Sequence, residues 1–203
     1  MKNPRAAQRT KATQGETASD SHVCPWWVGY LLLFPLRRLV EDPGKILGPH
    51  VRTGMTVLEP GCAMGFFSLP LARMVGPQGR VICVDVEPRM IARLRRRAHR
   101  AGLADRIDAS ICARDDLGID RRRGEVDLVV AIHVVHEVLD QKMLLTQLFD
   151  ALRPGGRLLV LEPKGHVKEH DFQRTLKVAG ATGLRELSPP GVRGDHTALL
   201  EKP

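Results

Sequence analysis

Val57-Leu58-Glu59-Pro60-Gly61-Cys62-Ala63-Met64-Gly65-Phe66-Phe67 is the stretch that decides the fold of this chain. The apolar run over residues 55–58 is typical of a buried parallel strand. Gly61 and Gly65 let the backbone turn sharply and approach a ligand closely, and from Phe66 the pattern becomes helical. A strand, a glycine loop and a helix in this order predict the nucleotide-binding crossover of a doubly wound α/β fold.

The spacing of the glycines separates two nucleotide classes. A dinucleotide-binding loop reads G-x-G-x-x-G, but Ala63 and Phe66 stand at its second and third glycine positions, so that template fails at two of three points. The remaining pattern, E-x-G-x-A-x-G from Glu59 to Gly65, resembles the first motif of class I methyltransferases that use S-adenosylmethionine (SAM). In that family the acid lies near the methionine end of the cofactor, so the resemblance implies a contact between Glu59 and its amino group. Ala63 departs from the usual middle glycine.

A second acid follows at the expected distance. The apolar strand predicted over residues 80–85 ends in Asp85, about 20 residues after Gly65. A carboxylate at this place can accept two hydrogen bonds from vicinal ribose hydroxyls. The alternative that Asp85 only caps the next helix stays open, because Asp is a favoured N-cap residue.

Later segments extend the resemblance over roughly residues 51–202. The strand D-L-V-V-A at 127–131, a helix, and L-R-P-G-G-R-L-L-V at 152–160 resemble later motifs of the same family, particularly its ubiquinone and menaquinone biosynthesis-type branch. The resemblance implies a Rossmann-like, doubly wound α/β fold with a seven-stranded, mostly parallel sheet and an antiparallel last strand. The predicted strands are 55–58, 80–85, 106–112, 126–132, 157–161, 184–187 and 196–200, and the main helices are 66–74, a helix ending at Gly102, 140–152 and 167–179.

The resemblance also implies a set of cofactor contacts. Family members often carry an Asp just after the third strand to accept from the adenine amino group, and here that position is Ala113. Adenine is then expected against backbone groups of residues 112–114, with Asp115 or Asp116 as substitutes. The cofactor is SAM and its product S-adenosylhomocysteine. The predicted cofactor-binding residues are Glu59, Gly61, Cys62, Ala63, Gly65, Asp85, Val86, Cys112, Ala113, Arg114 and Ala131.

Candidate catalytic residues follow the later strands. A sulfonium methyl group is already electrophilic, so the protein has to align an acceptor, exclude water and deprotonate an acceptor that is weakly acidic. The polar groups expected at the carboxyl ends of strands are His133, His136, Glu137, Glu162, Lys164 and His166.

His133 and His136 are the candidate general bases, since an unperturbed imidazole titrates near neutrality. A histidine there can equally shape the pocket or satisfy a backbone carbonyl. Glu162 follows an apolar strand, where a carboxylate needs a partner, and its role stays open between structure and function. His133-x-x-His136-Glu137 is not H-E-x-x-H and supplies no third ligand, so no metal site is predicted.

The formal charge of +8 raises a nucleic-acid hypothesis. At helical spacing an apolar stripe of Met90, Ile91, Leu94, Ala98 and Ala101 leaves the arginines of this segment on the opposite side. No aromatic residue is interleaved with them, which favours a solvated face; a contact with RNA is the alternative that stays open. The arginines are Arg89, Arg93, Arg95, Arg96, Arg97 and Arg100, with a second cluster at Arg121, Arg122 and Arg123.

Composition divides the chain into three parts. Residues 1–21 are polar and basic, and we expect a disordered tail. Residues 22–50 hold Trp26, Trp27 and Tyr30 and a predicted helix over 28–40, ended by Asp42-Pro43-Gly44 and followed by a short helical turn. This segment is either a hydrophobic anchor or a lid over the substrate pocket, or both. Residues 51–203 form the predicted SAM-binding domain.

The residue composition indicates in which cellular compartment we expect the protein. No apolar run reaches the length of a membrane span, and the N-terminus lacks the apolar core of a secretory signal. The four cysteines show no C-x-x-C spacing and are interpreted as small apolar residues. We expect a cytoplasmic protein, a monomer or homodimer.

The predicted function is methyl transfer from SAM to a small-molecule acceptor. The alternatives are an RNA or protein methyltransferase and a non-catalytic SAM-binding scaffold protein, with an oxidoreductase weakened by the failed glycine template.

Overall fold

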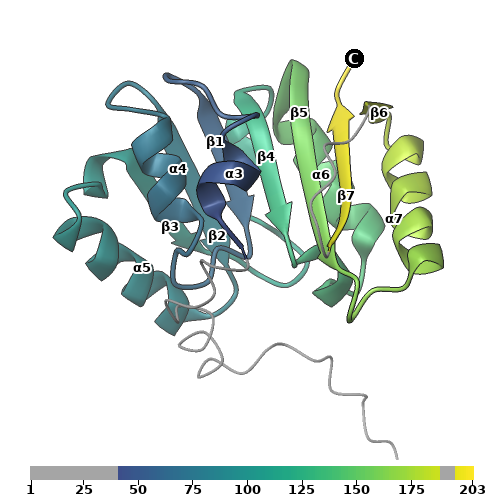
Figure 1. Ribbon diagram of the computed structural model, residues 1–203, viewed down its shortest axis with the longest axis horizontal. Helices are drawn as coiled ribbons and strands as arrows, with labels where there is room; N and C mark the ends of the chain where they lie inside the picture. The colour runs from purple at the N-terminus through teal and green to yellow at the C-terminus, as the bar shows by residue number, and fades with distance from the viewer. Residues whose placement is uncertain (1–40, 188–194) are drawn as a thin grey trace, which may run out of the picture.

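The computed structural model describes residues 41–187 and 195–203, which contain a seven-stranded sheet of order β3-β2-β1-β4-β5-β7-β6 (Figure 1). The strands are β1 Thr56–Pro60, β2 Arg80–Asp85, β3 Ile107–Ile111, β4 Val126–Ile132, β5 Leu152–Pro163, β6 Arg185–Leu187 and β7 Asp195–Glu201. The helices are α3 Pro43–Leu47, α4 Ser68–Met74, α5 Pro88–Arg100, α6 Gln141–Ala151 and α7 Glu169–Ala181, with short 3-10 helices η1 Ala104–Arg106, η2 Asp120–Arg122 and η3 Val135–Glu137.

Strand pairing confirms the predicted fold class. β1 pairs in parallel with β2 and with β4, and the chain therefore reverses its direction of travel across the sheet between these two neighbours. β5 pairs antiparallel with β7, and β7 antiparallel with β6. In Figure 1 the arrowheads of β1 and β4 point to the lower edge of the sheet and that of β7 to the upper edge. A ligand crevice is expected beyond the carboxyl ends of β1 and β4, where the strand order switches.

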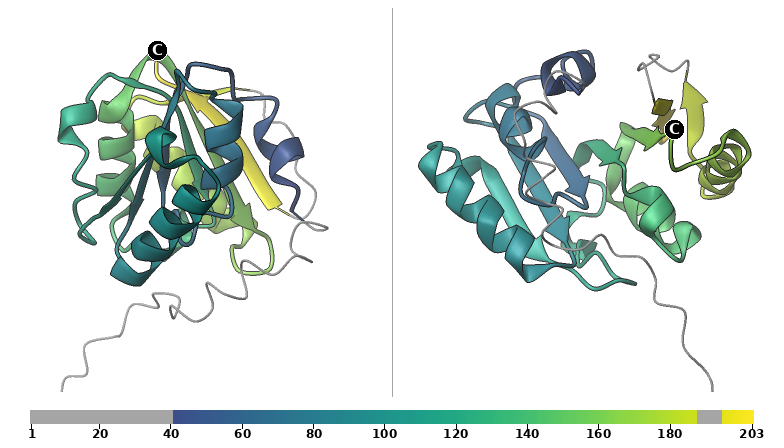
Figure 2. Two further views of the ribbon diagram at one scale, coloured as in Figure 1. Left: turned by 90° about the vertical axis from the view of Figure 1, so that its left-hand side faces the viewer. Right: turned by 60° about the horizontal axis from the view of Figure 1, so that its bottom comes forward.

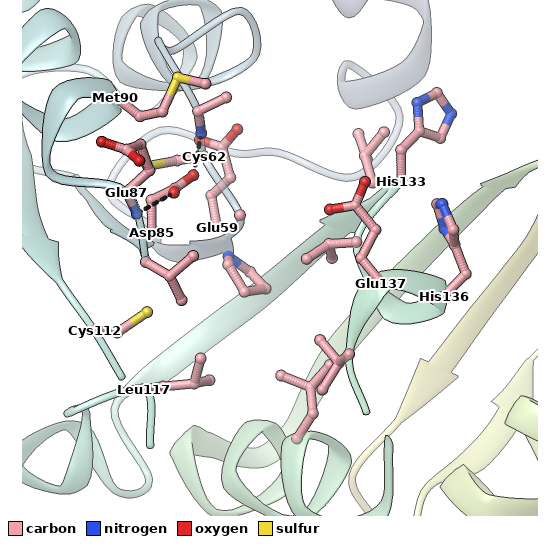
Figure 3. A pocket seen from close by; sticks show the side chains of 18 of the residues that line it. Glu59, Cys62, Asp85, Glu87, Met90, Cys112, Leu117, His133, His136 and Glu137 are labelled. Carbon is pink, nitrogen blue, oxygen red and sulfur yellow. Dashed lines mark hydrogen bonds between the residues drawn. The ribbon is translucent and has the colours of Figure 1, made fainter. Parts of the chain in front are cut away.

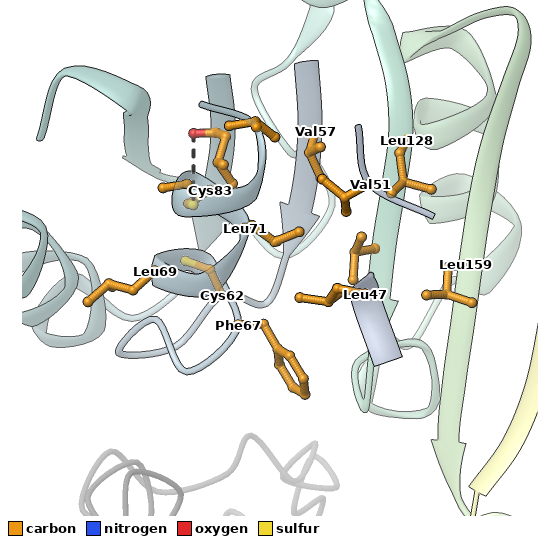
Figure 4. Close-up of a cluster of buried hydrophobic side chains, with 14 of the residues drawn as sticks. Leu47, Val51, Val57, Cys62, Phe67, Leu69, Leu71, Cys83, Leu128 and Leu159 are labelled. Carbon is orange, nitrogen blue, oxygen red and sulfur yellow. Dashed lines mark hydrogen bonds between the residues drawn. The ribbon is translucent and has the colours of Figure 1, made fainter. Parts of the chain in front are cut away.

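Helices cover both faces of the sheet, as the three views show (Figures 1 and 2). Alternate residues of β1 divide between the two cores: Val57 packs with α3, α4 and α5, while Leu58 packs with α6 and α7. Because both faces are covered, the central strands are predominantly apolar instead of alternating between apolar and polar residues. Figure 4 shows the first of these clusters, in which Leu47 and Leu71, both fully buried, lie near Leu128 and Leu159.

Most element boundaries agree with the sequence prediction within a few residues. The bounds of β2 and β4 coincide with it. β5 starts five residues earlier than predicted (152 instead of 157), because Leu152 pairs with Val126 and the Gly155-Gly156 backbone exchanges hydrogen bonds with Lys202. The amino group of Lys202 also binds the carbonyl oxygens of Phe149 and Leu152 at 2.8 and 2.7 Å, which satisfies acceptors at the end of α6.

The expected short helical turn is α3, and Asp42 begins it. The carboxylate of Asp42 accepts from the N–H of Gly44 at 2.8 Å, and Pro43 occupies the first turn, where a missing N–H does no harm. The predicted tail, the helix over 28–40 and the tryptophans of the predicted lid lie outside the described residues.

The amphipathic prediction for α5 is confirmed with two corrections. Met90, Ile91, Leu94 and Ala98 are buried, but Ala101 is exposed because it is the C-cap, beyond the last helical turn. Two arginines of this helix also bind backbone carbonyl oxygens, although Arg95 stays exposed and Arg97 is partly buried. Arg95 donates to the carbonyl oxygen of Ala109 at 2.5 Å, and Arg97 donates to the carbonyl oxygen of Met64 in the glycine loop.

No helix in residues 41–187 or 195–203 is both long and apolar enough to cross a membrane. Cys62, Cys83 and Cys112 are free thiols, and the first two are buried.

Candidate active site

A cavity of about 510 Å³ opens beyond the carboxyl ends of the parallel strands (Figure 3). Its walls come from the segments that follow β1, β2, β3, β4 and β5, which is where a doubly wound sheet places its ligands. The volume lies in the range of small-molecule sites. Glu59, Asp85 and Glu87 line one side, and His133, His136 and Glu137 line the side opposite.

The glycine loop is held against β2. The N–H groups of Gly61 and Cys62 donate to the carbonyl oxygen of Val84 at 2.8 and 3.2 Å. Gly61 has φ +66°, and a Cβ at this position would lie 2.6 Å from Cγ2 of Val134. Both the conformation and the close approach therefore require glycine, as the sequence predicts.

Asp85 fastens this loop to the start of α5. One carboxylate oxygen accepts from the N–H of Ala63 at 2.8 Å and the other from the N–H of Glu87 at 2.9 Å. Ala63 itself has φ +46°, a conformation that costs a non-glycine residue free energy. The N-cap of α5 is Glu87, so the alternative that Asp85 caps this helix is wrong. Burial raises the pKa of Asp85, and its predicted ribose contact stays a prediction.

Glu59 is the penultimate residue of β1, and only 5% of its surface is exposed. Its Oε2 atom accepts from the hydroxyl of Ser68 at 2.5 Å and lies 3.8 Å from the thiol sulfur of Cys83. Burial raises the pKa of Glu59 to about 8. Both groups donate to Oε2, so Oε1 is the oxygen that can bind a cation in the cavity.

The adenine end of the predicted site is lined by residues 112–114, Val86, Asp116 and Leu117. The N–H of Cys112 donates to Asp85 O at 3.1 Å and that of Ala113 to Asp116 O at 2.9 Å. These two N–H groups are therefore committed within the protein, and the predicted contact of an adenine ring with other backbone groups of residues 112–114 stays a prediction.

Two predicted cofactor residues do not line the cavity. Gly65 packs inward, and a Cβ on it would lie 2.4 Å from Cδ1 of Leu94. Ala131 is fully buried in β4. Lys164 and Asp115 also lie outside the lining, whereas His166 belongs to it.

His133 leaves the end of β4 with φ +56° and donates its backbone N–H to Leu161 O at 2.8 Å. Its ring nitrogens face two carboxylates: Nδ1 lies 3.8 Å from Glu41 and Nε2 lies 3.6 Å from Asp195. Both distances exceed a hydrogen bond, and among the described residues Nε2 has no hydrogen-bond partner.

His136 has a closer partner. Its Nδ1 contacts Oε2 of Glu162, whose side chain is only 2% exposed. Oε1 of Glu162 accepts from the N–H of Val135 at 2.8 Å and of His136 at 3.3 Å. The buried carboxylate of Glu162 therefore finds its hydrogen-bond partners in the backbone N–H groups at η3 and in the ring of His136. The hydrogen bond that the His136 ring donates to the Glu162 carboxylate raises the pKa of His136.

The cavity is acidic, and sequence reasoning missed part of this lining. Burial raises the pKa of Glu137, which faces the cavity between the two histidines and Asp85. A cluster of carboxylates fits a ligand with positive charge, and a cofactor that carries a sulfonium and an ammonium meets this condition. The acids of the lining are Glu41, Glu59, Asp85, Glu87, Asp116 and Glu137.

An apolar part of the wall was also missed, because it depends on the path of the loop after η3 and carries no motif. Its residues are Leu117, Val138, Leu139, Met143 and Leu144. Leu139 is 82% exposed at the rim, which makes it available to a ligand entering the cavity.

Comparisons with known proteins give the family and the fold of this chain. The family described as methyltransferase domain matches residues 52–190. The ubiquinone/menaquinone biosynthesis C-methyltransferases of Pseudoalteromonas translucida and Pasteurella multocida are each 31% identical to this chain over 147 and 112 residues, or 70% and 55% of it. The chain spans about half the length of these relatives, 57% and 41%. A SAM-dependent methyltransferase structure from Aquifex aeolicus shares the fold, with a TM-score of 0.78 and 21% identity over 87% of this chain and 98% of that one.

Proposed function

Because the chain belongs to the methyltransferase-domain family, we propose that it transfers the methyl group of SAM to a small-molecule acceptor. The observation that carries this proposal is the acidic cavity at the switch point of the sheet, with Glu59 and Asp85 held on one side of it by Ser68 and by the glycine loop.

The two acids have separate tasks. Asp85 is already oriented by the N–H groups of Ala63 and Glu87, and its remaining lone pairs accept from ribose hydroxyls. Glu59 offers Oε1 to the amino group of the methionine end. A cation at this place favours the charged carboxylate and so offsets the burial that raises its pKa. When bound, SAM supplies a methyl carbon that its sulfonium makes electrophilic.

The opposite side of the cavity serves the acceptor. His133, His136, Glu137 and His166 line it, and the two predicted bases, His133 and His136, can take a proton there. The rest of the wall excludes water from the reacting atoms.

A small acceptor is favoured by the position of the basic surface. Arg114 lines the cavity, but the arginines of α5 do not; this helix contributes Met90 to the wall. An RNA acceptor would place its phosphates next to the reacting atoms, where the lining is acidic. The names of the curated relatives also specify C-methyltransferases of ubiquinone and menaquinone biosynthesis.

Calorimetry with SAM and a methyl-transfer screen test the function. We expect SAM to bind and Asp85→Asn to weaken it about tenfold or more through one lost charge-assisted hydrogen bond. Asp108→Asn is the matched control, because Asp108 is exposed on β3 and bonds Arg122 away from the cavity.

The screen incubates the full chain with methyl-labelled SAM and, in separate reactions, with a small-molecule extract, with RNA and with protein. Label in a small product supports the proposal. Absence of SAM binding, or NAD binding more tightly than SAM, overturns it. SAM binding without transfer to any acceptor indicates the scaffold alternative, and label in RNA or protein indicates a macromolecular acceptor.

A further inference from the structure

We propose that Glu162 is a positioning residue, which fixes the imidazole of His136 so that its Nε2 acts as the general base of the acceptor side. This inference rests on the proposed function and names the group that takes the proton of the acceptor.

Three contacts from one segment converge on the Glu162 carboxylate. Oε1 accepts from the backbone N–H groups of Val135 and His136, and Oε2 contacts Nδ1 of the His136 ring. β5 carries Glu162 beside the end of β4, since Ile132 pairs with Leu161. A carboxylate that is 2% exposed is stable only when it is hydrogen-bonded. The buried acid thus holds both the backbone of η3 and its histidine.

This arrangement selects one tautomer of His136. Because Nδ1 donates to Glu162, the neutral ring carries its proton on Nδ1 and keeps its lone pair on Nε2. The side chain is 26% exposed and lines the cavity, so Nε2 is the ring nitrogen available to a bound acceptor. The Glu162 carboxylate also stabilises the imidazolium that forms when Nε2 takes a proton, which agrees with the raised pKa of His136.

The other candidate base lacks such an orienting partner. The ring nitrogens of His133 lie 3.8 and 3.6 Å from Glu41 and Asp195, beyond hydrogen-bond length, and neither distance fixes a tautomer. In Figure 3, His136 and Glu137 come from the same short helix, across the cavity from Asp85. Geometry therefore distinguishes two histidines that the sequence treats alike.

The charged and titratable groups around the pair come from five segments of the chain. Glu137 lies on η3 beside His136, and His166 follows β5 with its ring centroid 6.4 Å from that of His136. His196 on β7 stands opposite Glu162 in register and binds Glu169 at 3.1 Å. The pKa of Glu137 is raised first by burial, then by the charge of Glu162, and to a smaller extent by the charge of Asp85 across the cavity.

The step balances without a further reactant. The reacting atom of the acceptor gives its proton to Nε2 of His136 while its electron pair forms a bond to the methyl carbon. The carbon–sulfur bond breaks and leaves its electron pair on sulfur. The inference therefore specifies an acceptor that carries a proton on the reacting atom, since an acceptor without one needs no base.

The imidazole NMR signals of the full chain test the pair without an acceptor, with His136→Asn to assign the ring. We expect the Nδ1–H tautomer and a titration midpoint above the ordinary value of 6.5. Glu162→Gln keeps the shape but removes the charge, and it should lower the midpoint by about one pH unit. Glu169→Gln is the matched control: it removes a carboxylate that pairs with His196 and should leave His136 unchanged.

Either of two NMR outcomes overturns the inference: an Nε2–H tautomer in the parent protein, or the same His136 midpoint in Glu162→Gln. If Glu162→Gln does not fold, the tautomer of His136 in the parent protein alone decides whether the inference holds. Calorimetry with SAM on the same samples separates this inference from the proposed function, because absence of SAM binding refutes the function whatever the tautomer. If SAM binds and the Nδ1–H tautomer is present, Glu162→Gln should bind SAM as the parent protein does and transfer the label roughly 100-fold more slowly. Equal transfer rates in the two proteins refute the role of the His136–Glu162 pair.

Discussion

Replacing Glu59 by Gln should change how the stability of the ligand-free protein depends on pH. Burial raises the pKa of Glu59 from 4.5 to about 8, so the unfolded chain ionises this group first as the pH rises. The folded state therefore has its full stability with respect to Glu59 below about pH 4.5, and it loses that stability progressively until about pH 8. Glutamine has the same shape, can still accept from Ser68 and does not ionise.

The size of the effect follows from the pKa difference. At 1.36 kcal/mol per pKa unit, a change from 4.5 to about 8 makes the wild-type protein lose about 4 kcal/mol between pH 5 and pH 9 through this one group. Glu137, another acid whose pKa burial raises, acts equally in both proteins, and the charge interaction of Asp85 with Glu59 is part of the Glu59 effect. The difference between the two stability curves therefore isolates Glu59.

Urea unfolding at pH 5, 7 and 9 measures this difference. Between pH 5 and pH 9 we expect the free energy of unfolding of Glu59→Gln to rise by several kcal/mol relative to that of the wild type. The pH dependence of the exposed control Glu169→Gln should run parallel to that of the wild type. If the free-energy curves of wild type and Glu59→Gln stay parallel within 1 kcal/mol, Glu59 is not a neutral buried acid and the reasoning fails. In the wild type alone, SAM affinity should rise with pH up to about 8, because an ionised Glu59 binds the amino group.

Three further substitutions test the loop and the end of the sheet by thermal or urea unfolding. Gly61→Ala should cost about 1–3 kcal/mol, because its Cβ meets Val134 at 2.6 Å at φ +66°; adding Val134→Ala should recover part of the loss, and no recovery would refute the clash. Ala63→Gly should stabilise by up to about 1 kcal/mol, since relief of φ +46° outweighs the entropy of glycine; a less stable variant contradicts this. Lys202→Met should cost about 1–2 kcal/mol through its bonds to Phe149 and Leu152, and an unchanged midpoint shows that these bonds contribute nothing.

The fold was predictable because its signals are local and repeated. The run over 57–67 specifies strand, loop and helix, and the apolar strands at 80–85 and 126–132 have the predicted bounds. The early start of β5 could not be predicted, since it depends on pairing with Val126 and Lys202, which are distant along the chain.

The candidate site was predictable where a motif fixes a position. Glu59, Gly61 and Asp85 lie in the cavity lining as the loop motif and strand ends indicate. The pairing of His136 with Glu162 could not be predicted, because it requires the separation of β4 and β5 and the turn of η3. The committed N–H groups of Cys112 and Ala113 likewise follow from the path of a loop that no sequence pattern specifies.

The last strand has a consequence for the order in which the site becomes complete. Glu59, Asp85 and the apolar wall up to Leu144 are translated well before β7, whose Asp195 faces His133 and whose His196 stands opposite Glu162. On the ribosome, a nascent chain that ends before residue 195 contains Glu59 and Asp85 but lacks the strand that carries Asp195 and His196. The residues predicted to bind the donor and the groups of β7 beside the acceptor side therefore leave the ribosome at different times.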